Sequence, residues 1–174
     1  MLKGLVANLL ATAQCDVGVF ADRGVDGFSR IIVPYLGQAD DRGALRFARR
    51  IATNTGADVT VLHIVDPDAA PAVVEEREHY AKLMIEGTTA LIKRVRHKSP
   101  SDAVLEESAA GYNLVVVGLG QGWRQDDRIE TILTNSAPSV LVVAERLRVA
   151  TPTGTGREDD EDDEDNEETR WTAA

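Results

Sequence analysis

Five short hydrophobic runs alternate with longer amphipathic stretches between residues 29 and 146. Four of the runs are rich in β-branched residues and almost continuously apolar, which is typical of strands buried on both faces of a sheet. The third run is more polar and is predicted to lie toward a sheet edge. The predicted strands lie within residues 30–37, 58–66, 89–97, 113–120 and 139–146.

The stretches between these runs carry apolar residues at helical spacing. Helices are predicted over residues 39–53 and 71–87, from Pro100 onward, and over 126–136. Ser99 directly before Pro100 is a helix-capping signature. The second helix carries Val73, Val74, Arg77, Ala81 and Met84 at helical spacing. Strands that alternate with helices in this way predict an α/β domain with a doubly wound parallel sheet.

The opening of the chain repeats the pattern of its last predicted helix and strand. At an offset of 123 residues, Val17 matches Val140 and Val19 matches Val142. The residues before Val17 are amphipathic, which predicts a helix and then a strand within residues 1–23. A period of about 120 residues is the length of a small domain, so we expect residues 1–23 to be the end of a preceding repeat.

Composition adds a core and a tail to this picture. The chain has 174 residues, of which 43% are hydrophobic, enough for one domain with a real core. The formal net charge is -10, but ten of the 29 acidic residues lie within 158–168, so the remaining chain is nearly neutral. Residues 147–174 are predicted to be a disordered acidic tail. A solubilising role is favoured for it over an interaction tail or a cation-attracting brush.

Composition also disfavours several kinds of site and location. Cys15 is the single cysteine, so no internal disulfide is expected, and no group of residues has the spacing of a zinc site. No clustered basic face suggests nucleic acid, and no apolar run reaches the roughly 18 residues of a membrane helix. The opening resembles a signal peptide, but Gly4 and Asn8 interrupt its apolar part. A cytoplasmic location is therefore favoured over secretion.

A glycine-rich segment follows the fourth predicted strand and is the first candidate binding feature. Gly118, Gly120 and Gly122 lie where the ligand crevice of a doubly wound sheet opens. Their spacing is not the dinucleotide fingerprint, and no Lys-Ser or Lys-Thr pair makes a P-loop. Turn formation is favoured over phosphate binding. Trp123 is expected to fill a gap beside the short last helix, with adenine stacking as the alternative.

No arrangement of residues predicts catalysis. His63, His79 and His97 have no nucleophile at a recognisable spacing, and each is expected to be a satisfied core or surface histidine. The pairs Asp40-Asp41 and Asp126-Asp127 begin predicted helices, where the helix dipole explains them. We therefore predict no catalytic residues and no metal site, with a small α/β hydrolase as an alternative.

Several of these segments together resemble the universal stress protein domain. They are "RIIVPYLG", "GADVTVLHIVDP", "NLVVVGLG" and "APSVLVV", which recur here in the family's order. The resemblance covers residues 29–146. It implies a Rossmann-like sheet of five parallel strands in the order 3-2-1-4-5.

The resemblance also bears on ligands. ATP-binding members of the family carry an Asp two residues after the proline of the first strand, and a Gly-Ser or Gly-Thr motif after the fourth. Leu36 stands at the first of these positions, and the segment from Gly118 to Ala137 is shorter and lacks Gly-Ser. We expect no cofactor, with ATP or another adenine nucleotide as the alternative. The residues that match the family's crevice are Pro34, Tyr35, Val65, Gly118 and Gly120.

The opening segment and "GLGQGW" resemble a subgroup of the family. Its domains occur in tandem at the cytosolic C-terminus of membrane cation/proton antiporters and related transporters. The resemblance implies a transporter membrane domain as partner. Because dimers of the family pair their fifth strands, residues 16–21 are expected beside 139–144, within one chain or across a homodimer. The expected function is a cytosolic, non-catalytic regulatory or dimerisation domain. A stand-alone stress protein that binds an adenine nucleotide is the alternative.

Overall fold

The structure of the chain is a computed structural model that describes residues 12, 15–39, 41–120 and 127–145. The predicted acidic tail, residues 147–174, lies outside the described residues. So does the predicted opening helix, apart from Thr12.

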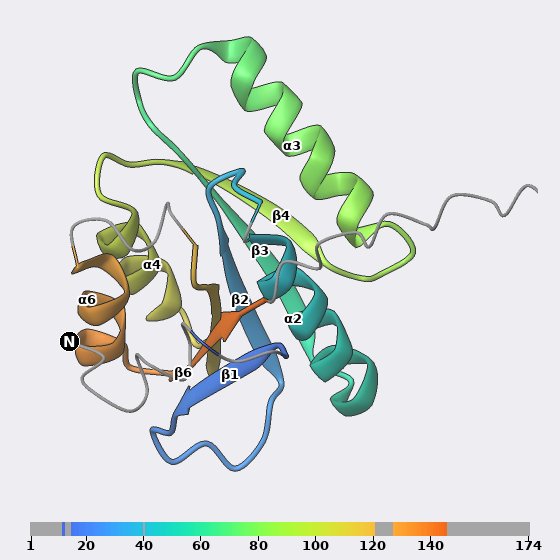
Figure 1. Cartoon of the computed structure of the whole chain (residues 1–174), viewed down its shortest axis with the longest axis vertical. Coiled ribbons are helices and arrows are strands. Elements are labelled where there is room, and N and C mark those ends of the chain that lie inside the picture. Colours follow the sequence, from blue (N-terminus) through green and yellow to red (C-terminus); the bar gives the residue numbers. More distant parts are fainter. Residues whose placement is uncertain (1–11, 13–14, 40, 121–126, 146–174) are drawn as a thin grey trace, which may run out of the picture.

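The described residues form a single sheet with helices on both faces (Figure 1). The strands are β1 (Val17–Ala21), β2 (Arg30–Tyr35), β3 (Asp58–Val65), β4 (Leu91–Arg96), β5 (Leu114–Gly118) and β6 (Ser139–Ala144). The helices are α2 (Asp41–Thr55), α3 (Pro71–Ile85), α4 (Pro100–Ser108) and α6 (Arg128–Asn135). Each of these helices begins within two residues of its predicted start. The side-chain oxygen of Ser99 caps α4 by accepting the backbone N–H of Asp102.

The strand order is β1-β6-β5-β2-β3-β4. The strands β4-β3-β2-β5-β6 run parallel to their neighbours, and they are the predicted order 3-2-1-4-5. The prediction of a five-stranded sheet was incomplete, because β1 pairs antiparallel with β6 and adds a sixth strand. The polar strand β4 lies at the opposite edge, as predicted.

Successive strand residues point to opposite faces of the sheet, which divides the core into two layers. Ile31, Val33 and Val61 pack on the face covered by α2 and α3. Ile32 and Leu62 pack on the face covered by α4 and α6. All five residues of β5 are buried. A strand covered on both faces needs apolar residues at every position, which is why its sequence shows no alternation.

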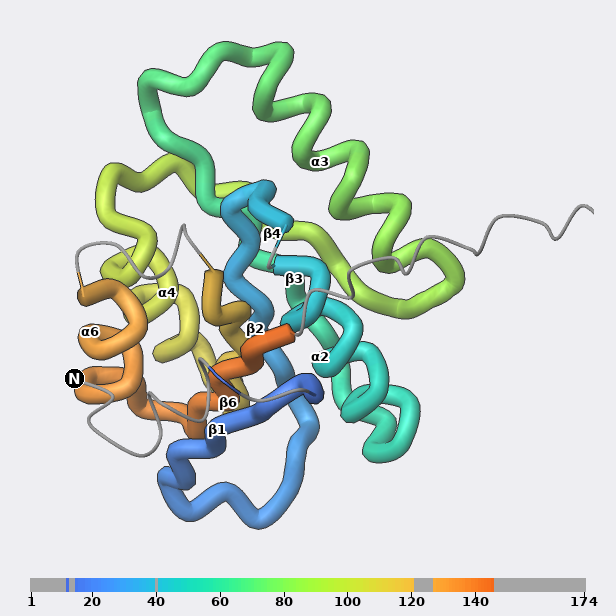
Figure 2. Tube along the Cα trace, viewed as in Figure 1, coloured from blue at the N-terminus to red at the C-terminus, as the bar shows by residue number. Residues whose placement is uncertain are grey.

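The pairing of β1 with β6 brings together residues far apart in the sequence (Figure 2). The register runs from Val17 opposite Ala144 to Ala21 opposite Val140, with Val19 opposite Val142 at its centre. Val19 and Val142 are also equivalent residues in the repeat at offset 123. The two strands are therefore related by a local two-fold axis through this central pair. Residues 16–21 were expected beside 139–144 either within one chain or across a homodimer. In the structure, β1 and β6 pair within one chain.

The connector after β1 is anchored to the start of β6. The backbone N–H of Arg23 donates to Ser139 Oγ over 2.9 Å, and the hydroxyl of Ser139 lies 3.3 Å from Asp22 Oδ1. Asp22 Oδ1 also accepts the backbone N–H of Gly24 over 2.9 Å. These contacts, led by the Gly24 amide, hold the pKa of Asp22 below its usual value. At the other end of the pair, Arg46 of α2 forms an ion pair with Glu145.

Helix α3 is only partly buried. Of the residues at helical spacing, Val74 and Ala81 are buried, whereas Val73 is 39% exposed. Tyr80 and Leu83 are also exposed, at 56% and 52%. The physical reason is that α3 stands partly away from the sheet, so that only one narrow strip of it reaches the core (Figure 1).

Candidate functional site

The carboxyl ends of β2, β3 and β5 meet at one edge of the sheet, where a ligand crevice is expected. The ladder between β2 and β5 consists of Ile31 opposite Leu114 and Ile32 opposite Val115. Both strands continue beyond these pairs, to Tyr35 and Gly118. Pro34 in this part of β2 has no N–H to donate to a ladder. The strand order reverses between β2 and β5, so the expected crevice lies at this point.

The predicted crevice residues lie at this edge, but their side chains differ in what they offer. Pro34, Tyr35 and Gly118 end two neighbouring strands, and Val65 ends β3. Val65 is buried, and its carbonyl oxygen accepts the backbone N–H of His97 over 3.0 Å. The backbone N–H of Gly120 donates to the Gly118 carbonyl over 3.1 Å. That amide is therefore already used within the chain. Gly122, Trp123 and Asp126 lie outside the described residues.

The side chain of Tyr35 is directed toward α3. It is 4% exposed, and its hydroxyl donates to the Arg77 carbonyl over 3.1 Å. Its ring contacts the His63 ring edge to face at 5.4 Å. Burial, followed by the charge of Asp41, raises the pKa of Tyr35 above its usual value. The side chain of Tyr35 therefore holds α3 against the sheet.

A buried carboxylate shapes the loop between β2 and α2. Asp41 is fully buried, and its Oδ2 accepts the backbone N–H of Leu36 over 2.8 Å and of Gln38 over 2.9 Å. An interaction with the helix dipole was the only role predicted for Asp41, and its contacts with the loop were not predicted. The available signal was an acidic residue at the end of the glycine-containing loop "PYLGQADD", because Asp side chains commonly accept nearby backbone N–H groups in turns.

The same loop passes closely under α3. Gly37 has φ of +79°, a left-handed conformation that favours glycine. A Cβ atom there would lie 2.6 Å from Arg77 Cγ. A groove of about 640 Å³ lies between this loop, α2 and α3. It is lined in part by Arg42, Glu76 and Tyr80. The groove combines cationic, acidic and aromatic side chains next to the expected crevice.

His63 is a core histidine, but it is not satisfied as predicted. It is 1% exposed, and its Nδ1 has no hydrogen-bond partner among the described residues. Burial lowers its pKa below the ordinary value of 6.5. The positive charges of Arg77 and Arg94 lower it further, and Glu78 opposes them. His63 is therefore neutral at pH 7, and its protonation in the folded state is unfavourable.

The other candidate groups do not converge on the crevice. His79 lies on exposed α3 beside Tyr80, and Nδ1 of His97 accepts the backbone N–H of Ser99 over 3.0 Å. Among the described residues, no group of three or more His, Cys, Asp or Glu side chains could hold a metal ion. No helix in the described part of the chain is long and apolar enough to cross a membrane.

With this geometry established, the chain can be compared with known proteins. The model of the universal stress protein family matches residues 27–143. Cation/H(+) antiporter 19 of Arabidopsis thaliana is 28% identical over 152 residues, which cover 82% of this chain and 18% of the antiporter. Cation/H(+) antiporter 1 of the same plant is 26% identical over 154 residues, which cover 66% of this chain and 20% of the antiporter. Cation/H(+) antiporter 15 is 38% identical over 73 residues, with 36% and 9% covered. The chain thus spans only 9–20% of the length of these relatives.

Solved structures share the fold. A universal stress protein from Archaeoglobus fulgidus DSM 4304 has a TM-score of 0.61 and 18% identity, and the match covers 82% of this chain and 56% of that protein. A universal stress protein in complex with cAMP has a TM-score of 0.53 and 19% identity, and the match covers 67% of this chain and 97% of that protein. An Arabidopsis thaliana member of the family with AMP bound has a TM-score of 0.50 and 13% identity, and the match covers 72% of this chain and 97% of that protein. At these identities the likeness establishes the fold.

The Asp41 carboxylate gives a testable prediction about the loop. Asp41→Ala leaves the N–H groups of Leu36 and Gln38 without their acceptor, and we expect the free energy of unfolding to fall by about 2–4 kcal/mol. Asp41→Asn keeps one carbonyl oxygen at the same place, and we expect at most about half of that loss. Urea unfolding followed by circular dichroism measures both. An Asp41→Ala variant as stable as the parent would contradict this role.

Burial of neutral His63 predicts a dependence of stability on pH. The pKa of His63 is depressed in the folded state, so the unfolded chain takes up a proton first as the pH falls below the ordinary value of 6.5. Stability is therefore retained above that pH and lost on acidification, by at most about 1.4 kcal/mol per pH unit. His63→Phe keeps a ring against Tyr35 and should remove this part of the loss.

Urea unfolding at a series of pH values from neutral to mildly acidic checks the prediction. The exposed His79 lies on α3, and His79→Gln is the matched control. This control should keep the parent's pH dependence. Equal slopes in the parent chain and His63→Phe would show that His63 is not the responsible group.

Proposed function

Since the chain belongs to the universal stress protein family, we propose that it is a non-catalytic regulatory domain that acts on the cytosolic side of a cation/proton antiporter. The similarity to three antiporters of Arabidopsis thaliana supports the transporter as partner. In this proposal, the domain changes the transport equilibrium through its contacts with neighbouring domains. It carries out no reaction of its own.

The single observation that carries the proposal is the two-fold relation between β1 and β6. Val19 faces Val142, and these residues are also equivalent in the repeat. Two copies of one strand that pair about their own centre form the contact expected between the last strands of two similar domains. We infer that residues 1–23 are the final helix and strand of a preceding stress-protein repeat. In this inference, β1 marks the position of that repeat beside residues 29–146.

This arrangement would link the two repeats mechanically. The backbone groups on the outer edge of β6 are satisfied by β1. Near the start of β1 and the end of β6, Arg46 on α2 forms an ion pair with Glu145, and its Nη2 lies 3.8 Å from Asp16 Oδ2. A rotation of the preceding repeat would therefore be transmitted to α2 and to the β2–α2 loop. Movement of packed elements about such an interface is a common form of regulation.

A chimeric transporter tests this function. Residues 1–174 replace the corresponding segment of Cation/H(+) antiporter 19, and cation-dependent proton exchange is measured in proteoliposomes. Val19→Asp places a charge at the centre of the β1–β6 pair. We expect the half-saturating cation concentration to shift by about fivefold, the lower end of usual coupling between sites.

The matched control carries the same kind of change at the other edge of the sheet. Leu91 on β4 is 70% exposed, so Leu91→Asp should leave transport as in the parent chimera. Circular dichroism of the isolated chains shows whether both variants are folded. Unchanged transport in the Val19→Asp chimera would overturn the proposed coupling.

Adenine-nucleotide binding is a second candidate function, with support from the carboxyl edge of the sheet. Pro34, Tyr35, Val65, Gly118 and Gly120 line this proposed crevice, and the groove beside it offers cationic side chains and Tyr80. The family members in complex with cAMP and with AMP support the same class of ligand. In this candidate, the phosphate lies toward Arg42 and the base lies over the strand ends.

Isothermal titration with ATP, AMP and cAMP tests this second candidate. We expect Arg42→Gln to weaken binding by about tenfold, because it removes a charge-assisted contact with phosphate. Arg50→Gln on the same helix lies outside the groove and should bind as the parent does. No measurable heat with any of the three nucleotides would exclude this function and leave the regulatory one intact.

A further inference from the structure

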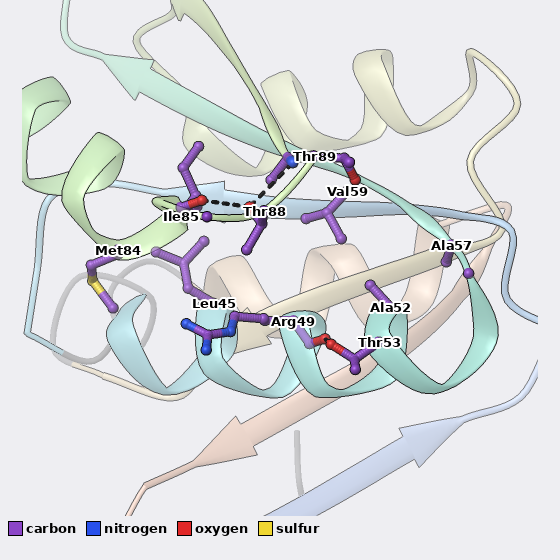
Figure 3. Close-up of a pocket in the computed structure, with 13 residues that line it drawn as sticks. Leu45, Arg49, Ala52, Thr53, Ala57, Val59, Met84, Ile85, Thr88 and Thr89 are labelled. Carbon is purple, nitrogen blue, oxygen red and sulfur yellow. Dashed lines mark hydrogen bonds between the residues drawn. The ribbon is translucent and has the colours of Figure 1, made fainter.

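A second cavity lies at the opposite end of the sheet from the crevice (Figure 3). Its walls come from the last turns of α2, the start of β3, the end of α3 and the turn that leads into β4. Its volume is about 320 Å³, at the lower end of the range for small-molecule sites. A cavity of this size suits a small ligand.

The floor of the cavity is apolar. Leu45, Ala57 and Val59 line it and are 4%, 5% and 8% exposed. Figure 3 shows Ile85 of α3 across the cavity from α2, and Met84 of α3 at one end of the cavity. A short hydrocarbon chain or a single aromatic ring placed here would be removed from water on several sides, which favours binding.

The lining carries one charged side chain, Arg49, and no acidic one. Figure 3 shows the Arg49 side chain beside Leu45, with its guanidinium group directed toward the Met84 end of the cavity. This guanidinium group has no ion pair or hydrogen bond within the described residues. By contrast, Arg46 and Arg94 are both in ion pairs. Arg49 is therefore available to an anionic ligand.

Two helices end at the cavity, and their last carbonyl groups would repel an anion if they were open. One carbonyl at each helix end is already satisfied. The Ala52 carbonyl of α2 accepts the backbone N–H of Gly56 over 2.8 Å. The backbone N–H of Thr88 donates to the Ile85 carbonyl over 3.0 Å. Arg49 is exposed to solvent, and it is the one charged residue in the cavity lining.

We propose that this cavity binds a small amphipathic carboxylate, with its apolar part on Leu45 and Val59 and its carboxylate on Arg49. An arginine guanidinium group matches a carboxylate in shape and can donate two parallel hydrogen bonds to it. The site is separate from the carboxyl-edge crevice and shares no residue with the predicted crevice set. Its occupant would contact both α2 and α3 and would hold α3 to α2.

The test is an NMR titration of the full chain with octanoate and benzoate, with octanol and benzyl alcohol as neutral counterparts. We expect shifts at Leu45, Val59 and Met84. We also expect octanoate to bind about fivefold to tenfold more tightly than octanol, since the extra contact is a partly exposed charge pair. Raising the salt concentration should weaken octanoate binding and leave octanol binding unchanged.

Two arginines on one helix provide the matched variants. Arg49→Gln should bring octanoate to the affinity of octanol, whereas Arg50→Gln removes the same charge one residue away and should change neither affinity. Arg50 does not line the cavity. Ala52→Leu fills the cavity and should weaken all four probes, and its amide spectrum shows whether the chain stays folded. Equal effects of Arg49→Gln and Arg50→Gln, or shifts confined to other parts of the chain, would overturn the proposal.

Discussion

The backbone hydrogen-bonding requirement of β6 is the constraint on which the arrangement of this domain depends. A parallel sheet that ended at β6 would leave a row of unpaired N–H and C=O groups on a strand whose residues are mostly buried. β1 satisfies that row in the antiparallel direction, and Ser139, Asp22 and Arg23 fix its far end. An edge strand taken from the start of the chain thus becomes part of the domain's own sheet. The local two-fold axis at Val19 and Val142 makes this contact similar to an interface between two domains.

The two ends of the sheet differ in chemistry because the loops at each end satisfy different backbone groups. At the carboxyl end, the buried Asp41 carboxylate accepts two N–H groups and fixes the loop that follows β2. Tyr35 and His63 turn their rings toward α3 at the same end. At the amino end, helix carbonyls are capped by the chain itself, which leaves Arg49 as the charge that faces an apolar cavity. The two proposed sites therefore differ in chemistry, since a nucleotide is proposed for one end and a small carboxylate for the other.

Helix α3 connects these two regions. It packs against the sheet through a narrow strip that includes Val74 and Ala81, and the groove and the cavity both use its side that faces α2. A helix with few buried apolar contacts belongs to the less stable part of a fold. Ligand binding shifts the position of such elements most easily. Nδ1 of His63, which has no hydrogen-bond partner within the described part of the chain, lies under the same helix, and protonation of His63 at acidic pH destabilises the fold. Control of the position of α3 would link ligand binding to the contacts of a regulatory domain.

The α/β class, the five parallel strands and the start of each described helix to within two residues could be predicted from the sequence. This was possible because continuous apolar runs such as that of β5, and helix signals such as Ser99-Pro100, depend on local periodicity and local hydrogen bonds. The sequence also indicated the match between Val19 and Val142, since a repeat is visible without any structure. Only the tertiary structure decided that these two residues face each other within one chain, that Asp41 is buried against the loop, and that Val73 is exposed. Those outcomes depend on which surfaces meet across long stretches of chain, and periodicity along the sequence carries no information about the partner that covers a given face.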